Sequence, residues 1–131
     1  MRVTKSNINK FIEGTRINCP DMGITHLEYI PDGITRLNCY DNKLTELPKL
    51  PESLISLYCE DNKLTELPKL PDGLKYLDCD NNRLTELPKL PESLEYLYYH
   101  NNNLPYEITI DNLKQHNTLI KRKQILKRIC G

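Results

Sequence analysis

The feature that most constrains this chain is an internal repeat with a period of 20 residues and no insertion. The string L-T-E-L-P-K-L-P at residues 44–51 recurs at residues 64–71 and again at residues 84–91. A weaker copy precedes these three, and before that only Ile17 and Cys19 keep the pattern. Self-similarity at a short fixed period is typical of repeat architectures, in which each unit is covered by its neighbours rather than by a separate core.

Each unit combines a strand pattern with a proline-rich stretch. Leu57 and Cys59 alternate with polar neighbours, which predicts a short strand with both of these side chains pointing inward. The Leu-Pro-x-Leu-Pro stretch excludes a helix on the opposite side of the unit and favours an extended, polyproline-like path. One unit cannot bury its own apolar face, so we predict that each unit winds once, as a coil, and stacks on the next. Adjacent strands then lie ~4.8 Å apart in a parallel sheet.

These residues resemble the bacterial-type leucine-rich repeat, the shortest class of that family. This class is known from secreted effectors of bacterial pathogens, and related cysteine-containing forms occur in proteins of large DNA viruses. The resemblance covers about residues 14–105 and rests on several slots that recur in phase in each unit. It implies a leucine-rich-repeat solenoid with a parallel β-sheet on its concave face and an extended convex side. It also implies a binding role rather than catalysis.

The two ends of the chain depart from the repeat, and we expect them to cap the solenoid. Residues 1–16 are expected to form an N-terminal cap, residues 17–105 the leucine-rich repeats, and residues 106–131 a helical, basic C-terminal cap. The apolar contacts expected of the N-terminal cap are Val3, Ile8, Phe11 and Ile12. In the C-terminal segment, the pattern predicts one helix within residues 110–117 and a second over residues 118–129.

The charge divides at the same boundary. Lys plus Arg and Asp plus Glu each total 18, so the net charge is zero, which argues against a generally basic nucleic-acid binder. Residues 1–105 nevertheless carry 12 basic and 16 acidic residues, whereas residues 106–131 carry 6 and 2. The C-terminal segment contains a basic patch of Lys121, Arg122, Lys123, Lys127 and Arg128. We interpret this patch as the solvated outer face of the cap, with a nuclear import signal or a weak nucleic-acid contact as alternatives.

Two polar ladders recur with the repeat. The cysteines at 20-residue spacing lack the C-x-x-C spacing of a metal site, so we interpret them as small core residues: Cys19, Cys39, Cys59 and Cys79. The asparagines are expected to bridge the backbone of their own coil and the next: Asn42, Asn62, Asn82 and Asn102. The odd cysteine count and the lack of a visible secretory signal predict a reduced, intracellular protein. Since the sequence has no long apolar stretch, we expect no insertion into a membrane.

The strand positions between the core residues point to the concave face and vary from unit to unit. Their first column reads Arg16, Arg36, Ser56, Tyr76, Tyr96; the second reads Asn18, Asn38, Tyr58, Asp78, Tyr98; the third reads Pro20, Tyr40, Glu60, Asp80, His100. The tyrosines are expected to form a diagonal aromatic patch beside the carboxylates, suited to a partner with apolar and basic groups. The candidate partner-binding residues are Tyr40, Tyr58, Glu60, Tyr76, Asp78, Asp80, Tyr96, Tyr98 and His100.

Signatures of catalysis are missing from the sequence. It contains no phosphate-binding glycine loop, no H-E-x-x-H motif and no G-x-S-x-G motif. Ser53 and Ser93 alternate with Gly33 and Gly73 at turn positions, which indicates a turn requirement rather than a nucleophile. We assign no catalytic residue, no cofactor and no metal.

The leading hypothesis is a non-catalytic interaction module that binds a protein or peptide on its concave face. Two alternatives stay open at the level of sequence. The first is binding to nucleic acid or to another anionic surface through the basic C-terminal segment. The second is a purely structural solenoid that associates through its ends, although we favour a monomer over an oligomer.

Overall fold

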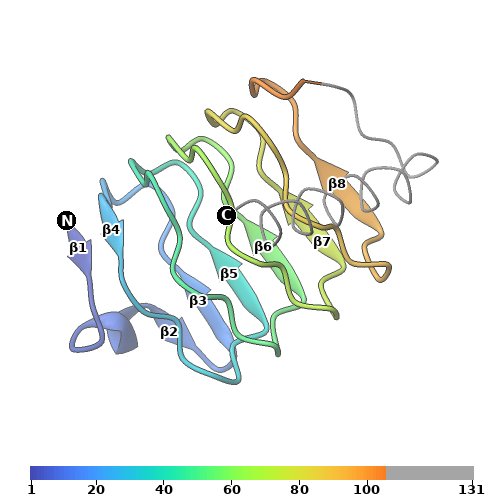
Figure 1. The fold of residues 1–131 in the computed structure, drawn as a ribbon. Helices are drawn as coiled ribbons and strands as arrows, with labels where there is room; N and C mark the ends of the chain where they lie inside the picture. Colours follow the sequence, from blue (N-terminus) through green and yellow to red (C-terminus); the bar gives the residue numbers. More distant parts are fainter. Residues whose placement is uncertain (106–131) are drawn as a thin grey trace, which may run out of the picture.

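The computed structural model describes residues 1–105 of the chain, and these residues form a solenoid of stacked coils (Figure 1). The elements in chain order are β1 (Arg2–Val3), η1 (Ile8–Phe11), β2 (Ile12–Glu13), β3 (Arg16–Asn18), β4 (His26–Leu27), β5 (Arg36–Asn38), β6 (Ser56–Tyr58), β7 (Tyr76–Asp78) and β8 (Tyr96–Tyr98). One sheet has the order β2-β3-β5-β6-β7-β8, in which β2 is antiparallel to β3 and the other neighbours are parallel. The predicted solenoid with a parallel sheet on its concave side is confirmed.

The strand register follows the 20-residue period. Leu37 pairs with Leu57, Leu57 with Leu77, and Leu77 with Leu97. Because side chains alternate between the two faces of a strand, this register places every core leucine of one slot in a single column. A shift of one residue would carry that whole column to the solvent side.

The core consists of such columns running along the solenoid. Leu57 and Cys59 are both fully buried, as predicted. The leucines of the proline-rich side are buried as well, so this side of each coil is fixed by its own core contacts; they are Leu47, Leu50, Leu67, Leu70, Leu87 and Leu90. In β8, the last strand described, Leu97 is only half-buried. The helical C-terminal cap predicted for residues 106–131 lies outside the described residues.

The asparagine ladder satisfies backbone groups that the sheet leaves unpaired. Asn62 Nδ2 donates to the carbonyl oxygens of Cys39 at 3.0 Å and Cys59 at 3.2 Å, and Asn62 Oδ1 accepts from the Leu44 N–H at 3.0 Å. Asn82 makes the same contacts one coil later. Each asparagine therefore bridges its own coil and the preceding one. The predicted bridging is confirmed, but its direction, toward the next coil, was wrong.

The residue before the ladder slot, which holds Met22 in the first coil and asparagine in the later ones, adopts a left-handed backbone conformation. The φ values are 51° for Asp21, 57° for Asp41, 56° for Asp61, 55° for Asn81 and 56° for Asn101. Asp and Asn tolerate this region better than other residues that carry a side chain. This slot therefore holds Asp in the first three coils and Asn in the next two, because the chain turns sharply there, at the rim of the concave face.

The N-terminal segment covers the first coil on two sides. β1 pairs in parallel with β4 on the side opposite the main sheet, while β2 closes the edge of the main sheet against β3. Val3 and Ile8 are buried in the core, and Phe11 and Ile12 pack partly buried against it, so the predicted contacts of the cap are confirmed.

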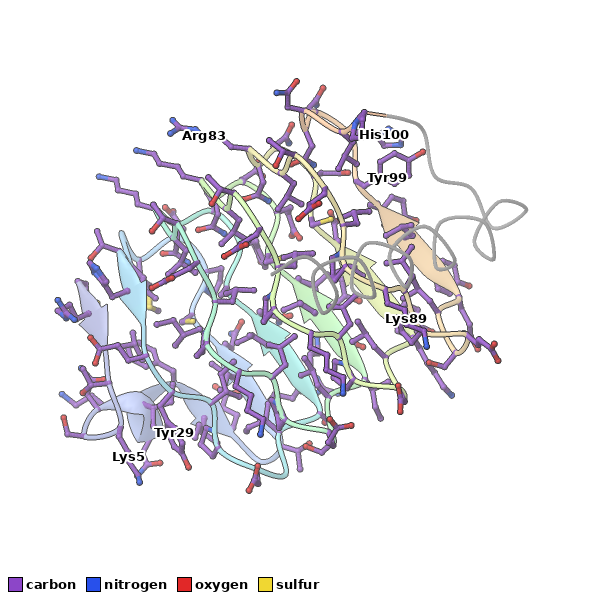
Figure 2. The ribbon with its side chains drawn as sticks, in the orientation of Figure 1. Lys5, Tyr29, Arg83, Lys89, Tyr99 and His100 are labelled. Carbon is purple, nitrogen blue, oxygen red and sulfur yellow. The ribbon has the colours of Figure 1, made fainter. Side chains whose placement is uncertain are left out.

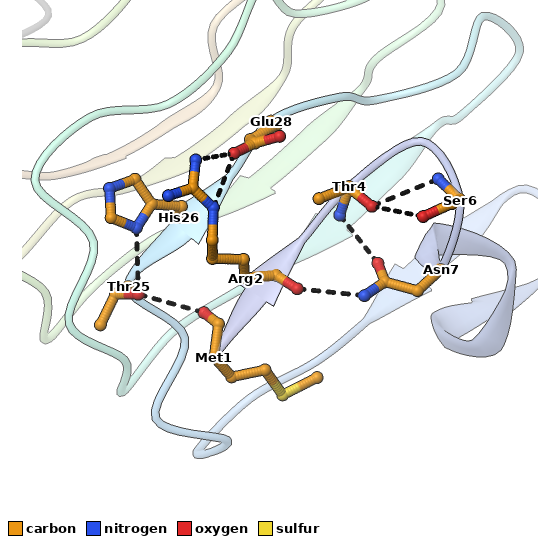
Figure 3. Close-up of polar contacts among 8 residues, drawn as sticks. All are labelled: Met1, Arg2, Thr4, Ser6, Asn7, Thr25, His26 and Glu28. Carbon is orange, nitrogen blue, oxygen red and sulfur yellow. Dashed lines mark hydrogen bonds and ion pairs between the residues drawn. The ribbon is translucent and has the colours of Figure 1, made fainter.

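Polar contacts fix the β1 strand in place (Figure 3). Arg2 forms an ion pair with Glu28, and Asn7 Nδ2 donates to the carbonyl of Arg2 at 3.0 Å. The Thr25 N–H donates to the carbonyl of Met1 at 2.9 Å. A separate observation concerns membranes: the part of the chain that the structure describes, residues 1–105, contains no helix with the length and apolar character of a membrane span.

Candidate functional site

The concave face presents three columns of side chains, one for each outward-facing slot. The register places Ser56, Tyr76 and Tyr96 in one column, because β6, β7 and β8 pair in phase. The same pairing aligns Tyr58, Asp78 and Tyr98 in the second column. The third column lies just beyond the strand ends, where the N–H groups of Asp41, Asp61 and Asn81 donate to the carbonyls of Glu60, Asp80 and His100. All nine predicted partner-binding residues occupy these columns.

The tyrosines on this face make different contacts from one coil to the next. Tyr76 and Tyr96 stack with ring centroids 4.8 Å apart and an angle of 6° between their planes. Tyr58 instead packs under Arg36, whose guanidinium carbon lies 4.7 Å from the ring centroid. Tyr98 is 48% exposed. The diagonal therefore contains a tyrosine stack and a separate cation–π pair.

The carboxylates gather beside these rings and are held by backbone hydrogen bonds. Asp78 Oδ1 accepts from the Asp80 N–H at 3.1 Å, and Asp80 Oδ1 accepts from the His100 N–H at 2.6 Å. Glu60, Asp78 and Asp80 are all half-buried. The positions of Asp78 and Asp80 are thus set in part by backbone N–H donors, and Asp78 also shares a side-chain hydrogen bond with Glu60.

Glu60 is the most perturbed acid of this group. Burial raises its pKa to about 7, and the negative charges of Asp78, Asp61 and Asp80 add to that effect, while a hydrogen bond from its own backbone N–H opposes it. The pKa of Asp78 is also raised, mainly by burial. Glu60 Oε2 is buried and has no hydrogen-bond partner. A cationic group placed here would favour the ionised form of both carboxyl groups.

Arg36 belongs to this face although the sequence reasoning did not select it. Its Nε donates to Asn38 Oδ1 at 3.1 Å, and Asn38 Nδ2 lies 3.4 Å from Asn18 Oδ1. The signal was present in the sequence, because Arg16 and Arg36 fill the same column as Tyr76. The sequence reasoning had selected tyrosines, acids and His100 on this face, but no arginine.

The cysteine ladder is inert core. Burial raises the pKa of the Cys39 and Cys59 thiols well above the usual value, and that of Cys19 to about 11. The thiols of Cys19 and Cys79 donate to backbone carbonyls at 3.5 and 3.3 Å. Among residues 1–105, no group of His, Cys, Asp and Glu side chains is arranged to hold a metal ion. The interpretation as small core residues is supported by this environment.

A second surface feature lies away from the concave face. A hollow of about 470 Å³ is lined by residues 28–30, Asp32 and Gly33 of the first coil and by residues 48–53 of the second. At its edge, Lys5 Nζ lies 5.2 Å from the centre of the Tyr29 ring (Figure 2). Glu28 is already paired with Arg2, so the hollow presents fewer free charges than the concave face. The basic patch of Lys121, Arg122, Lys123, Lys127 and Arg128 lies outside the described residues.

Stacked coils with a parallel sheet and an open concave face define a solenoid repeat protein, a class whose curved surface commonly serves for binding. Residues 52–92 match the family described as "Leucine Rich repeats (2 copies)". Among solved structures, the chain is similar to YopM from Yersinia enterocolitica WA-314, at 35% identity and a TM-score of 0.61. That match covers 65% of this chain and 20% of the YopM chain. No curated protein matches the sequence.

The described residues thus form a leucine-rich-repeat solenoid similar to that of a bacterial protein, which supports the resemblance that the residue pattern indicated. Repeats of this kind typically act as protein-interaction modules rather than catalysts. The region matched in the YopM chain is only about a fifth of that chain's length.

Proposed function

We propose that this chain is a non-catalytic interaction module that binds a protein or peptide on its concave face. The observation that carries the proposal is the contrast between columns: the core slots repeat, while the exposed slots beside them change from Arg and Asn to Tyr and carboxylate. A fixed scaffold with a variable exposed face is the pattern expected when the face, and not the fold, determines what is bound.

Binding on this face depends on rigid presentation. The tyrosines supply apolar area with a polar tip and few rotatable bonds, and Tyr76 and Tyr96 already restrict each other by stacking. Asp78 and Asp80 are oriented by backbone N–H donors. Little side-chain entropy is then lost when a partner binds. The chemistry favours a partner that offers apolar and basic groups.

The setting of the protein is part of the proposal. Free thiols at Cys19, Cys39, Cys59 and Cys79 support a reducing, intracellular location. The division into an N-terminal cap at residues 1–16, repeats at residues 17–105 and a basic cap at residues 106–131 is proposed with it. We propose a monomer, because the exposed columns of residues 1–105 mix polar, charged and aromatic groups instead of forming one large apolar patch.

The proposal is tested by capture from a lysate with matched variants. The immobilised protein is compared with a concave variant carrying Tyr58→Ala, Tyr76→Ala and Tyr98→Ala, and with a convex variant carrying Lys49→Ala and Lys69→Ala. We expect the convex variant to retain the proteins that the wild type binds, and the concave variant to lose them while keeping its circular dichroism spectrum. Equal capture by the two variants would show that the concave face is not the binding surface.

A further inference from the structure

The concave face carries opposite charges at its two halves. The arginine half comprises Arg16 and Arg36 in the first two coils, and the acidic half comprises Glu60, Asp78 and Asp80 in the next two. Among residues 1–105, neither arginine lies within salt-bridge distance of a carboxylate, since the ion pair found there joins other residues near the N-terminus. The two halves therefore do not neutralise each other.

The arginine half is organised to receive an acid. Arg36 is half-buried, its Nε donates a hydrogen bond to Asn38, and its guanidinium carbon lies 4.7 Å from the centroid of the Tyr58 ring. No described residue accepts a hydrogen bond from its two Nη groups. A guanidinium that is fixed in place and has free N–H groups pairs with carboxylates through two parallel hydrogen bonds.

The acidic half is organised to receive a base. The aspartates are held by backbone donors, and Glu60 Oε2 is buried without a hydrogen-bond partner. An ammonium or guanidinium group above Asp78 and Asp80 would offset the negative charge that these carboxylates share with Glu60. The charges at the rims of the concave face do not follow this division: the acid Asp41 lies beside the arginine half, and the base Lys75 lies beside the acidic half. These rim charges are exposed, so solvent and salt screen them more strongly than the half-buried charges of the face.

We propose that the concave face takes a bipolar peptide segment, with an acidic residue over Arg36, an apolar residue against Tyr58 and Tyr76, and a Lys or Arg over Asp78. This inference rests on the proposed function and adds the charge order of the partner to it. Arg36 and Asp78 are separated by two strand spacings and two residues along the strand, or about 12 Å between backbone positions. An extended segment spans that distance with about four residues.

The test is selection from a phage-displayed library of random dodecapeptides. Separate selections use the wild type, Arg36→Glu, Arg16→Glu and a charge-matched convex control, Lys69→Glu. Arg16 is exposed, so its variant keeps the proposal testable if the half-buried Arg36 proves necessary for folding. We expect peptides from the wild type and from Lys69→Glu to carry an acid and a base about four residues apart. Peptides from either arginine variant are expected to keep the base and lose the acid.

Affinity measurements on the selected peptide complete the test. We expect Arg36→Glu to weaken binding of the bipolar peptide roughly tenfold or more, and Lys69→Glu to change it less than about twofold. Two results would overturn the charge order while leaving the proposed function intact. In the first, the enriched peptides need the tyrosines but carry no acid. In the second, the wild type and the arginine variants select peptides with the same charges. If no peptide is enriched relative to the concave tyrosine variant, both the charge order and a peptide-binding concave face are contradicted.

Discussion

Replacing Asn62 with alanine tests how the coils are held together. Only 8% of Asn62 is exposed. Its side chain makes two hydrogen bonds to the second coil and two within its own, third coil. Alanine leaves the Leu44 N–H buried without its acceptor. The carbonyl of Cys39 keeps a donor in Asn42 and that of Cys59 keeps one in Asn82, so these groups are not orphaned.

The cost of Asn62→Ala therefore comes mainly from one buried N–H. A buried donor without a partner costs ~1–3 kcal/mol, and the weakened carbonyl contacts place the expected loss in the upper part of that range. Urea unfolding followed by far-ultraviolet circular dichroism measures it. Asn102→Ala is the matched control, because the same bond to the Leu84 N–H is only partly buried there and a smaller loss is expected. A loss near zero for Asn62→Ala would refute the reasoning.

Three further predictions concern the acid cluster, the thiols and the core. Glu60→Gln is expected to stabilise the protein by about 1 kcal/mol at pH 8, after allowance for solvent screening of a half-exposed group. Because the pKa of Glu60 is raised to about 7 in the fold, this gain should disappear below about pH 4.5, where the wild-type carboxyl is protonated in both states; an unchanged gain from pH 4 to pH 8 would contradict the assignment. A thiol reagent at pH 8 should label Cys39 and Cys59 only as denaturant unfolds the chain, and labelling in the native state would contradict their burial. Leu57→Ala should cost about 2–5 kcal/mol in urea unfolding, whereas Ile55→Ala, at a 40% exposed position, should cost less than about 0.5 kcal/mol; equal costs would contradict the core columns.

The core and the register could be predicted because a strict period places identical residues in identical environments. Leu57, Leu77 and Leu97 had to share a column once the unit was taken as one coil. The asparagine ladder could be predicted for the same reason, but its direction could not. That direction depends on which backbone groups of the neighbouring coil lie within reach of the side chain, such as the Leu44 N–H for Asn62, and the period does not specify them. The direction also explains why Met22 fills the slot in the first coil, where no repeat coil precedes it.

The details of the concave face depend on side-chain contacts that no period specifies. The tyrosine diagonal was predicted from strand positions alone, and these positions could not indicate that Arg36 lies against the Tyr58 ring. Ser53 was interpreted as a turn residue, yet its hydroxyl also donates to the carbonyl of Ile34 at 2.7 Å and so links two coils. The short strands β1 and β4 gave no periodic signal, because two residues cannot establish a period.

The central claim, that the concave face binds the partner, is tested most directly by amide hydrogen exchange with and without a partner protein recovered by capture. We expect binding to slow exchange along the exposed columns of β5, β6, β7 and β8, centred on Tyr58 and Asp78. Exchange at the proline-rich convex stretches, such as residues 45–49, should be unchanged. Slowed exchange on the convex stretches, with none along the strands, would contradict the claim.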